Sequence, residues 1–283
     1  MATLLKGAPV AKEIAALTAE RAARLAQEGI TPTLALVRVG ESDADVYYER
    51  AAMKRCEACG VAVRNYMFPA SVEEDELILR IRQLNVDDSV HGVLIFRPLP
   101  KAISDARVRA SLDVRKDVDG ITDASLGGIF TGTRVGFNPC TAESALSILR
   151  YYGVKLEGAR AAVIGRSLVI GKPVSQLLMN ENATVTVCHS KTKNLNEELR
   201  RADIIVTAVG KPGTVTVGAV RPGQVIVDVG IATDENGNMV GDVEFNDVAP
   251  FVGAITPVPG GVGAVTTAIL AYHTVQAAIR ARG

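Results

Sequence analysis

A glycine-containing turn in the second half of the chain has the residue types of a phosphate-binding loop. The apolar run Ala161–Ile164 is followed by Gly165–Ser167, and Gly171–Pro173 opens a helical pattern. Glycines permit a tight turn, and the amides at the start of a helix attract an anion. Five residues separate Gly165 from Gly171, so the spacing matches neither the G-x-G-x-x-G fingerprint nor the P-loop. The turn is therefore compatible with a nucleotide site or with an ordinary strand-to-helix connection.

The residues after the next strand-like run distinguish between the two nicotinamide dinucleotides. An NAD site would usually have a carboxylate at this point to bind the ribose hydroxyls. Here Cys188 is followed by His189, Ser190 and Lys191, and Arg166 is available from the first turn. Hydroxyl and cationic groups suit a ribose 2′-phosphate, which favours NADP over NAD. The alternative is that these are solvated loop residues.

Four more loops rich in glycine or proline occur in the same half. They are Gly210–Gly213, Asp228–Gly230, Gly241–Asp242 and Pro257–Gly263. Loops at the carboxyl edge of a parallel sheet are where ligands bind. The last loop leads directly into the final helical pattern, so backbone amides and a helix N-terminus are expected to meet there.

The cysteines and histidines give no disulfide or metal pattern. Four cysteines are too few for a disulfide scaffold of 283 residues, which favours a reducing cytoplasm. Cys56 and Cys59 form one C-x-x-C within a helical pattern, and the three histidines are far apart. Ordinary helix packing is the favoured interpretation of this pair over a metal or redox role, and no metal site is predicted.

Parallel sheets must position these loops, and the hydrophobic pattern predicts them. Short β-rich runs alternate with longer helical patterns, as in βαβ units, so the fold class is α/β with two domains. The expected strands are 33–39, 61–68, 90–96, 161–164, 183–188, 203–209 and 224–229, and the expected helices are 9–27, 43–59, 72–84, 141–152 and 264–280. The strands of the second half are nearly continuous apolar runs, as strands buried on both faces require. The segment 116–136 is predicted to be a loop-rich hinge that carries function.

Composition excludes several classes of protein. Lys plus Arg and Asp plus Glu are 31 each, so a net charge of zero argues against a nucleic-acid binder. No Trp and 4% aromatic residues leave few surfaces on which single strands could stack. No run reaches the roughly 18 apolar residues of a membrane span, and the start has no sustained apolar signal region. A protein without a membrane segment, located in the cytoplasm, is expected.

The combination of motifs resembles the methylenetetrahydrofolate dehydrogenase/cyclohydrolase family, the FolD type, over nearly the whole chain. The motifs that carry the resemblance are Val39-Gly40 before Tyr48, Pro98–Pro100, Lys116–Gly120, Pro139–Thr141, Gly165–Ser167 with Gly171–Pro173, Cys188–Ser190, Val209–Gly213, Asp228–Gly230, Val240–Val243 and Ile255–Gly263. The resemblance implies an amino-terminal open α/β folate-binding domain (1–120 with about 266–283), a Rossmann-like NADP-binding domain (about 138–265), a cleft between them and a homodimer. It implies tetrahydrofolate one-carbon derivatives as substrates, and no nucleic-acid or membrane partner is expected.

The resemblance also implies the site residues. Tyr48 and Asp119 are the predicted catalytic residues, and Asp119 is expected to accept two parallel hydrogen bonds from the amino-pyrimidinone edge of a pterin. Asp117 is expected to be a structural, loop-capping partner. The predicted substrate-binding residues are Tyr48, Pro98, Leu99, Asp119, Pro259, Gly260 and Gly261. The predicted cofactor-binding residues are Gly165, Arg166, Ser167, Gly171, Pro173, His189, Ser190, Gly210, Pro212, Gly230 and Ile231.

Two members of the family's catalytic pattern are missing together. The family has a lysine four residues after the tyrosine, where this chain has Ala52, and a glutamine where it has Phe96. Ala264-Val265 also replaces the usual Pro-Met. Lys54 lies about 120° away from the tyrosine's helical face. Arg55 returns to that face about 10 Å further along the axis, but it would stay charged and be a poor proton acceptor.

These departures affect the family's two reactions differently. Oxidation of 5,10-methylenetetrahydrofolate to the methenyl cation needs no proton transfer by the protein, whereas hydrolysis of the cation needs general acid–base catalysis. The sequence therefore predicts an NADP-dependent dehydrogenase with weak or absent cyclohydrolase activity. The alternatives are the full bifunctional enzyme, a paralogue that only binds folate or nucleotide, and the same chemistry on a modified one-carbon carrier.

Overall fold

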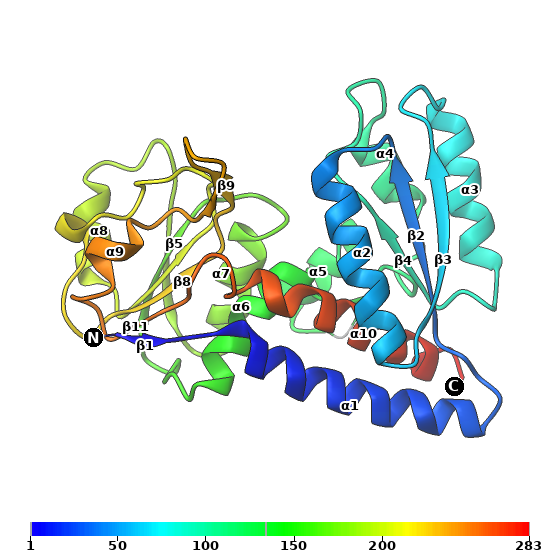
Figure 1. Cartoon of the computed structure of the whole chain (residues 1–283), viewed down its shortest axis with the longest axis horizontal. Coiled ribbons are helices and arrows are strands. Elements are labelled where there is room, and N and C mark those ends of the chain that lie inside the picture. The colour runs from blue at the N-terminus through cyan, green and yellow to red at the C-terminus, as the bar shows by residue number, and fades with distance from the viewer. Residues whose placement is uncertain (1, 134, 283) are drawn as a thin grey trace. The chain divides into compact units, whose positions relative to one another are not determined.

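The computed structural model describes residues 2–133 and 135–282, which divide into two compact units. The six-stranded unit comprises residues 1–11 and 141–266, and the three-stranded unit comprises residues 12–140 and 267–283. The division falls within helices α1 (Gly7–Gln27) and α10 (Gly263–Arg280). The predicted α/β fold with two domains is confirmed (Figure 1).

The six-stranded unit contains one parallel sheet of Rossmann type with the strand order β1-β11-β8-β7-β5-β6. Its strands are β1 (Thr3–Leu4), β5 (Arg160–Ile164), β6 (Thr184–Cys188), β7 (Ile204–Thr207), β8 (Val225–Asp228) and β11 (Ala254–Ile255). The remaining elements are the hairpin of β9 (Ala232–Thr233) and β10 (Met239–Val240), the 3-10 turn η1 (Val217–Ala219) and the helices α6 (Cys140–Tyr151), α7 (Gly171–Asn180), α8 (Leu195–Arg201) and α9 (Phe245–Val248).

The start of the chain belongs to this sheet, which differs from the predicted domains. Strand β1 pairs in parallel with β11, with Leu4 opposite Ile255. The first eleven residues therefore group with the six-stranded unit and not with the three-stranded unit, whereas the predicted domains placed them with residues 12–120. A two-residue strand has no periodic signal, so the sequence pattern could not reveal this pairing.

The strand interiors match the hydrophobic prediction in all but one case. The four residues of β7 are buried, and β5 is buried after its first residue. Strand β6 was expected to be buried on both faces, but three of its five residues are exposed because β6 lies at the edge of the sheet. Its Thr184 and Thr186 alternate with valines, which fits an edge strand.

The three-stranded unit has a parallel sheet in the order β3-β2-β4 (Figure 1). All seven residues of the central strand β2 (Thr33–Val39) are buried, and it pairs with β3 (Ala62–Phe68) and β4 (Gly92–Ile95). The helices of this unit are α2 (Asp43–Ala58), α3 (Glu74–Val86), α4 (Asp105–Ser111) and α5 (Asp123–Thr131). Apolar side chains of α3 and Val108 of α4 pack with the strands in one core.

Helix α5 lies within the segment that was expected to be loop-rich. Thr122 caps its first turn by accepting a hydrogen bond from the Ser125 amide, and Gly132 ends it in the left-handed conformation. Gly127 and Gly128 lie in the middle of this helix, where glycine is unfavourable by about 1 kcal/mol relative to alanine. The two glycines explain why the sequence pattern did not predict α5.

In the described part of the chain, no helix is both long enough and apolar enough to cross a membrane.

Candidate active site

Tyr48 and Phe96 lie together at one end of the three-stranded sheet. Helix α2 begins after Ser42, whose hydroxyl accepts from the Asp45 amide, and it carries Tyr48 in its second turn. Phe96 directly follows β4, and its amide donates to the carbonyl of Val37 at 2.9 Å. The two ring centroids are 6.1 Å apart with the rings at 78°, which is the preferred edge-on geometry. The Tyr48 ring therefore lies next to the carboxyl end of β4.

Ala52 presents only a methyl group one turn after Tyr48. Its side chain is fully buried. Lys54 is exposed and Arg55 is partly buried near Cys56, where its charge lowers the pKa of that thiol against the dominant effect of burial. The position four residues after Tyr48 therefore holds no ionisable group. Arg55, three residues after Ala52, lies on the same side of the helix, but an arginine is a poor proton acceptor.

A buried ion pair fixes α2 on the sheet. Arg38, on β2, donates from Nε to Oε2 of Glu49 at 2.7 Å, and its Nη1 donates to the carbonyl of Gly40. Both side chains are almost completely buried. Glu49 directly follows Tyr48, so the pair holds the turn of α2 that carries the tyrosine. Sequence reasoning missed this pair, although an arginine in an otherwise apolar strand was a usable signal.

Pro98 and Leu99 form the loop after β4, next to Phe96. Pro98 is exposed, and Leu99 is partly buried against the core of the three-stranded unit. The peptide bond between Arg97 and Pro98 is cis.

Asp119 belongs to the same edge of the sheet. The amide of Val93 in β4 donates to the carbonyl of Lys116, and Val93 forms a parallel bridge with Asp117. The segment ending at Asp119 therefore runs alongside β4 and in the same direction. Burial raises the pKa of Asp119 to about 6, while the positive charge of Arg97 and a hydrogen bond with Cys140 act in the opposite direction.

Asp117 has the structural role predicted for it. Its carboxylate accepts hydrogen bonds from the amides of Ile121 and Thr122 at 2.9 and 2.8 Å and from the Ser125 hydroxyl at 2.6 Å. These bonds join the Asp119 loop to the start of α5. The carboxylate of Asp117 is completely buried, so Asp119 is the partly exposed carboxylate of the two.

In the six-stranded unit, the Gly165 turn is closed by backbone contacts. The Gly165 amide donates to the carbonyl of Cys188, and its φ of 117° is available only to glycine. A Cβ on Gly171 would overlap the Gly165 carbonyl. Ser167 accepts from Ile170 through its hydroxyl and from Lys172 through its carbonyl. Both glycines are therefore required for α7 to start directly beside this turn, with Pro173 in its first turn.

The cationic and hydroxyl groups predicted to bind a 2′-phosphate come from adjacent strand ends. Ile164 of β5 pairs with Cys188 of β6, so Arg166 and Ser167 follow one strand while His189 and Ser190 follow its neighbour. The His189 amide donates to the Thr192 hydroxyl at 2.8 Å, and His189 Nδ1 accepts from the Lys191 amide at 3.1 Å. Arg166, Ser167 and Ser190 are exposed. No carboxylate occurs between Cys188 and Glu197.

Two buried carboxylates hold the other predicted cofactor loops. The Asp242 carboxylate accepts from the Thr207 hydroxyl and from the amides of Val209 and Lys211, at 2.7 to 2.8 Å. These bonds fix the loop that contains Gly210 and Pro212. Sequence reasoning did not identify Asp242 as a support, because the pairing depends on contacts between segments more than 30 residues apart.

Asp228 has the reciprocal role. Its carboxylate accepts from the amides of Gly230, Asp242 and Val243 at 2.9 to 3.1 Å. A Cβ on Gly230 would overlap the Asp242 carboxylate, and a Cβ on Gly241 would overlap the Asp228 carboxylate. Each aspartate thus lies against the glycine of the other segment. Burial raises the pKa of Asp228 to about 6, and the neighbouring Asp242 adds to this effect.

The remaining predicted substrate loop belongs to the six-stranded unit. The carbonyl of Gly260 accepts from the Gly7 amide at the start of α1, and a Cβ on Gly261 would crowd the Pro257 carbonyl. Pro259 and Gly260 are exposed. The structure therefore brings Tyr48, Pro98, Leu99 and Asp119 together in one unit and holds residues 259–261 in the other.

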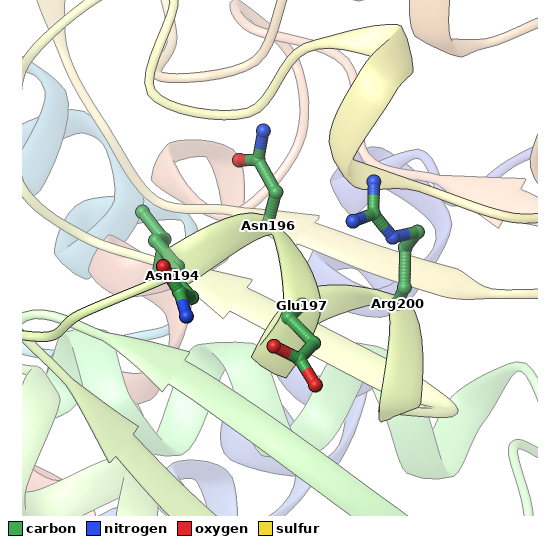
Figure 2. Close-up of a pocket in the computed structure, with 5 residues that line it drawn as sticks. Asn194, Asn196, Glu197 and Arg200 are labelled. Atoms are coloured by element: carbon green, nitrogen blue, oxygen red, sulfur yellow. The ribbon is translucent and has the colours of Figure 1, made fainter.

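A hollow of about 430 Å³ lies at the start of α8, and none of the predicted site residues lines it. Asn194, Asn196, Glu197 and Arg200 surround it together with Leu195 (Figure 2). Its lining is mostly polar and belongs to one short helix, so it offers no apolar enclosure for a ligand.

The cysteines have no redox or metal arrangement among the described residues. All four are free and buried, and no group of three His, Cys, Asp or Glu side chains in that part of the chain could hold a metal ion. Burial raises the pKa of Cys56 to about 12, so its thiolate is not formed near neutral pH. The C-x-x-C pair therefore packs α2 against the core.

Two family models together match most of the chain. Residues 5–119 match the catalytic domain of tetrahydrofolate dehydrogenase/cyclohydrolase, and residues 139–282 match its NAD(P)-binding domain. The chain is similar to the bifunctional protein FolD of Carboxydothermus hydrogenoformans, with 47% identity over 98% of this chain and 97% of that protein. It is also similar to FolD proteins of Alkaliphilus oremlandii and Clostridioides difficile, each 43% identical over 97% or more of this chain.

Solved structures agree with these matches. The bifunctional FolD enzyme of Campylobacter jejuni superposes with a TM-score of 0.97 at 39% identity, covering 99% of both chains. The FolD enzyme of Trypanosoma brucei, solved with NADP and an inhibitor, has a TM-score of 0.94 at 33% identity and covers 99% of this chain and 98% of its own.

Proposed function

Because the chain belongs to the tetrahydrofolate dehydrogenase/cyclohydrolase family, we propose that it oxidises 5,10-methylenetetrahydrofolate with NADP and hydrolyses the product weakly or not at all. The observation that carries the second half of this proposal is Ala52. It is fully buried one turn after Tyr48, and its methyl group leaves that position without an ionisable side chain.

The folate substrate is proposed to bind at the carboxyl edge of the three-stranded sheet. Asp119 accepts hydrogen bonds from the N–H groups of the pterin, and Tyr48 lies beside the reacting part of the substrate. Pro98 and Leu99 provide apolar contact. Residues 259–261 of the six-stranded unit are the further proposed contacts.

NADP is proposed to bind at the carboxyl edge of the six-stranded sheet, and the residues present fit it. The turn at Gly165 and the start of α7 present backbone amides, and Gly171 and Pro173 allow the close approach of that helix. Arg166, Ser167, His189 and Ser190 supply donors and a positive charge for the 2′-phosphate. The loops with Gly210, Pro212, Gly230 and Ile231 are the proposed contacts for the remainder of the dinucleotide. When bound, the nicotinamide ring accepts the hydride.

The two chemical steps demand different things from the chain. Loss of hydride leaves a cation delocalised over two nitrogens of the folate, so the protein needs only to position the substrate. Hydrolysis requires a water to lose protons while a ring nitrogen gains one, and a positioned acid or base typically contributes about 10²- to 10⁴-fold. Tyr48 remains at the site, and the side chain one turn after it, Ala52, supplies neither an acid nor a base.

Absorbance spectra recorded over time with 5,10-methylenetetrahydrofolate and NADP test this function. We expect NADPH and the methenyl cation to rise together and the cation to decay no faster than in buffer. Rapid appearance of 10-formyltetrahydrofolate without accumulation of the cation would contradict the proposal. A parallel titration with NAD checks the cofactor, because much tighter binding of NAD would overturn the preference for NADP.

The full bifunctional activity is the second candidate. It is favoured by the relative at 47% identity and by the Campylobacter jejuni enzyme, both of which are described as bifunctional. In that case a group other than a lysine of α2 would activate the water.

A homodimer in the cytoplasm is proposed for the assembled protein. The exposed edge strand β6, with Val187 about 40% exposed, is the kind of surface that proteins commonly cover by association.

A further inference from the structure

Arg97 and Asp119 end two neighbouring segments at the same edge of the three-stranded sheet. The parallel bridge between Val93 and Asp117 sets their register. Asp119 lies two residues beyond this bridge on its segment, and Arg97 lies four residues beyond it on the other. Arg97 lies in the bend that follows β4, and Asp119 lies in the turn that follows the bridge, so both residues lie at this edge of the sheet.

The guanidinium of Arg97 is only partly used by the protein. Its side chain is 18% exposed, and Nη1 lies 3.5 Å from Oδ1 of Asp105. Its Nε–H is buried and has no hydrogen-bond partner among the described residues. Burying such a donor without a partner costs about 1 to 3 kcal/mol, and more on a charged group, so buried donors of this kind are normally satisfied. The Nε–H therefore points to a ligand atom that accepts a hydrogen bond.

The carboxylate of Asp119 is close enough to feel this positive charge. Arg97 opposes the effect of burial on the pKa of Asp119, yet the two side chains do not form an ion pair within 4 Å of each other in the described residues. Asp119, whose carboxylate only accepts hydrogen bonds, and Arg97, whose guanidinium only donates them, thus lie at one edge of the sheet without forming a direct ion pair.

The pyrimidinone edge of a pterin has the complementary pattern. Its ring N3–H and exocyclic amine donate, and the 4-oxo oxygen beside them accepts. We propose that Arg97 is a specificity-determining residue whose Nε–H donates to the 4-oxo oxygen of the pterin while Asp119 accepts from its N–H groups. This inference rests on the proposed folate-binding function and names the group by which this site selects a 4-oxo pterin.

The test compares tetrahydrofolate with its 4-amino counterpart, in which the oxygen is replaced by an amine that donates. Dissociation constants for both are measured anaerobically by calorimetry at pH 7.5 for the wild type and Arg97→Met. Loss of a hydrogen bond from a charged donor typically lowers affinity about tenfold to a hundredfold. We expect this loss for tetrahydrofolate and little or no loss for the 4-amino compound, so the ratio of the two constants changes by at least tenfold.

Two further variants test whether the changed preference between the two ligands comes from the Arg97 donor, and not from altered folding or from the loss of a positive charge. Arg107→Met removes an exposed arginine of α4 that pairs with Glu74 and Asp75, and it should leave both affinities unchanged. Arg97→Lys keeps the positive charge but lacks the Nε–H donor, so it should show the altered ratio while the pH dependence of tetrahydrofolate binding stays close to that of the wild type.

The outcomes distinguish this inference from the proposed function. If Arg97→Met loses equal affinity for both ligands while the wild type reduces NADP with methylenetetrahydrofolate, the role of Arg97 is overturned and the proposed function stands. If the wild type binds neither tetrahydrofolate nor its 4-amino counterpart, the proposed function fails and this inference fails with it.

Discussion

At position 52, α2 presents a methyl group on the face that it shares with Tyr48, and Phe96 lies edge-on to the tyrosine ring. These apolar groups can line a substrate but cannot carry a proton. Lys54 is exposed on another part of the helix surface, and the partly buried Arg55, three residues after Ala52, has a side chain that is a poor proton acceptor. Under the proposed function, these residues position the substrate for hydride transfer, and hydrolysis lacks a base at position 52.

Restoring the missing pair should restore hydrolysis. Ala52 is fully buried and Phe96 is 7% exposed, so a lysine alone would lack space, and we expect Ala52→Lys with Phe96→Gln to be needed together. The double variant should hydrolyse methenyltetrahydrofolate at least about tenfold faster than the wild type, because a positioned base contributes 10²- to 10⁴-fold when fully effective. The decay of methenyl absorbance measures it.

A size-matched control separates charge from space. Ala52→Met with Phe96→Gln fills a similar volume without a basic group and should hydrolyse the cation no faster than the wild type. Equal rates for the lysine and methionine variants would show that a base at position 52 is not what hydrolysis needs here.

The protonation of Asp119 should make folate binding depend on pH. Because burial raises its pKa to about 6, the carboxyl is ionised above that pH and protonated below it. A protonated carboxyl carries a hydrogen on one oxygen and cannot accept two parallel hydrogen bonds, one on each oxygen, so the affinity for tetrahydrofolate should be constant above about pH 7 and fall as the pH drops through 6. Calorimetric titrations from pH 5 to 8 measure this.

Asp119→Asn provides the comparison for that profile. The amide has no charge to lose, so this variant should bind tetrahydrofolate about tenfold or more weakly at pH 7.5 and show no transition near pH 6. An unchanged profile in the variant would assign the transition to another group. Unchanged affinity at pH 7.5 would remove Asp119 from the pterin site.

At the scale of elements, the carboxyl ends of the parallel strands position nearly every proposed contact. In the six-stranded unit, Asp228 and Asp242 hold the loops after β7 and β8 through six hydrogen bonds to backbone amides and the Thr207 hydroxyl. The glycines at 230 and 241 make room for these carboxylates. Packing against these carboxylates explains the glycines at 230 and 241 as well as contact with a ligand would.

Replacing Asp242 should weaken NADP binding through the loop that it holds. The Asp242 carboxylate accepts from the Thr207 hydroxyl and from the amides of Val209 and Lys211. In Asp242→Asn one carboxylate oxygen becomes an NH₂ group, which cannot accept, so at least one of these buried donors loses its partner. We expect NADP affinity to fall about tenfold, with the affinity for tetrahydrofolate unchanged. Asp247→Asn, at an exposed position of α9, is the matched control and should change neither. Equal weakening of both ligands would indicate general destabilisation instead.

The elements show how far the sequence pattern could predict this fold. The nearly continuous apolar runs of β5, β7 and β8 correctly indicated parallel strands buried on both faces. Helix α5 was missed because its stability comes from the cap at Thr122 and the buried Asp117, and not from a helical pattern in the sequence. The reciprocal contacts of Asp228 and Asp242 could not be predicted either, because they depend on the three-dimensional approach of distant loops.

At the scale of the whole molecule, two units of different architecture divide the proposed work. The three-stranded unit contains Tyr48, Arg97 and Asp119, and the six-stranded unit contains the turn at Gly165 and the loops at 210 and 230. The family resemblance identified both activities, and residue patterns alone identified only the nucleotide loops. The proposed loss of hydrolysis is decided at the residue scale, by Ala52 and Phe96.

The assembled protein is expected to be a dimer. Light scattering during size-exclusion chromatography should give twice the mass of one chain at micromolar concentration. Val187→Lys on the edge strand β6 places a charge on an exposed apolar position and should shift the mass toward one chain if that edge lies in the interface. A wild-type mass of one chain would contradict the dimer, and an unchanged Val187→Lys dimer would assign its interface to another surface.

The central claim is that the chain lacks effective cyclohydrolase activity, and it is tested most directly on the second step alone. Purified 5,10-methenyltetrahydrofolate is mixed with the wild-type protein at neutral pH without NADP, and its absorbance decay is compared with that in buffer. We predict equal decay rates, in a preparation that reduces NADP with methylenetetrahydrofolate. Decay accelerated about tenfold or more by the wild type would show that another group activates water and would contradict the assignment based on Ala52.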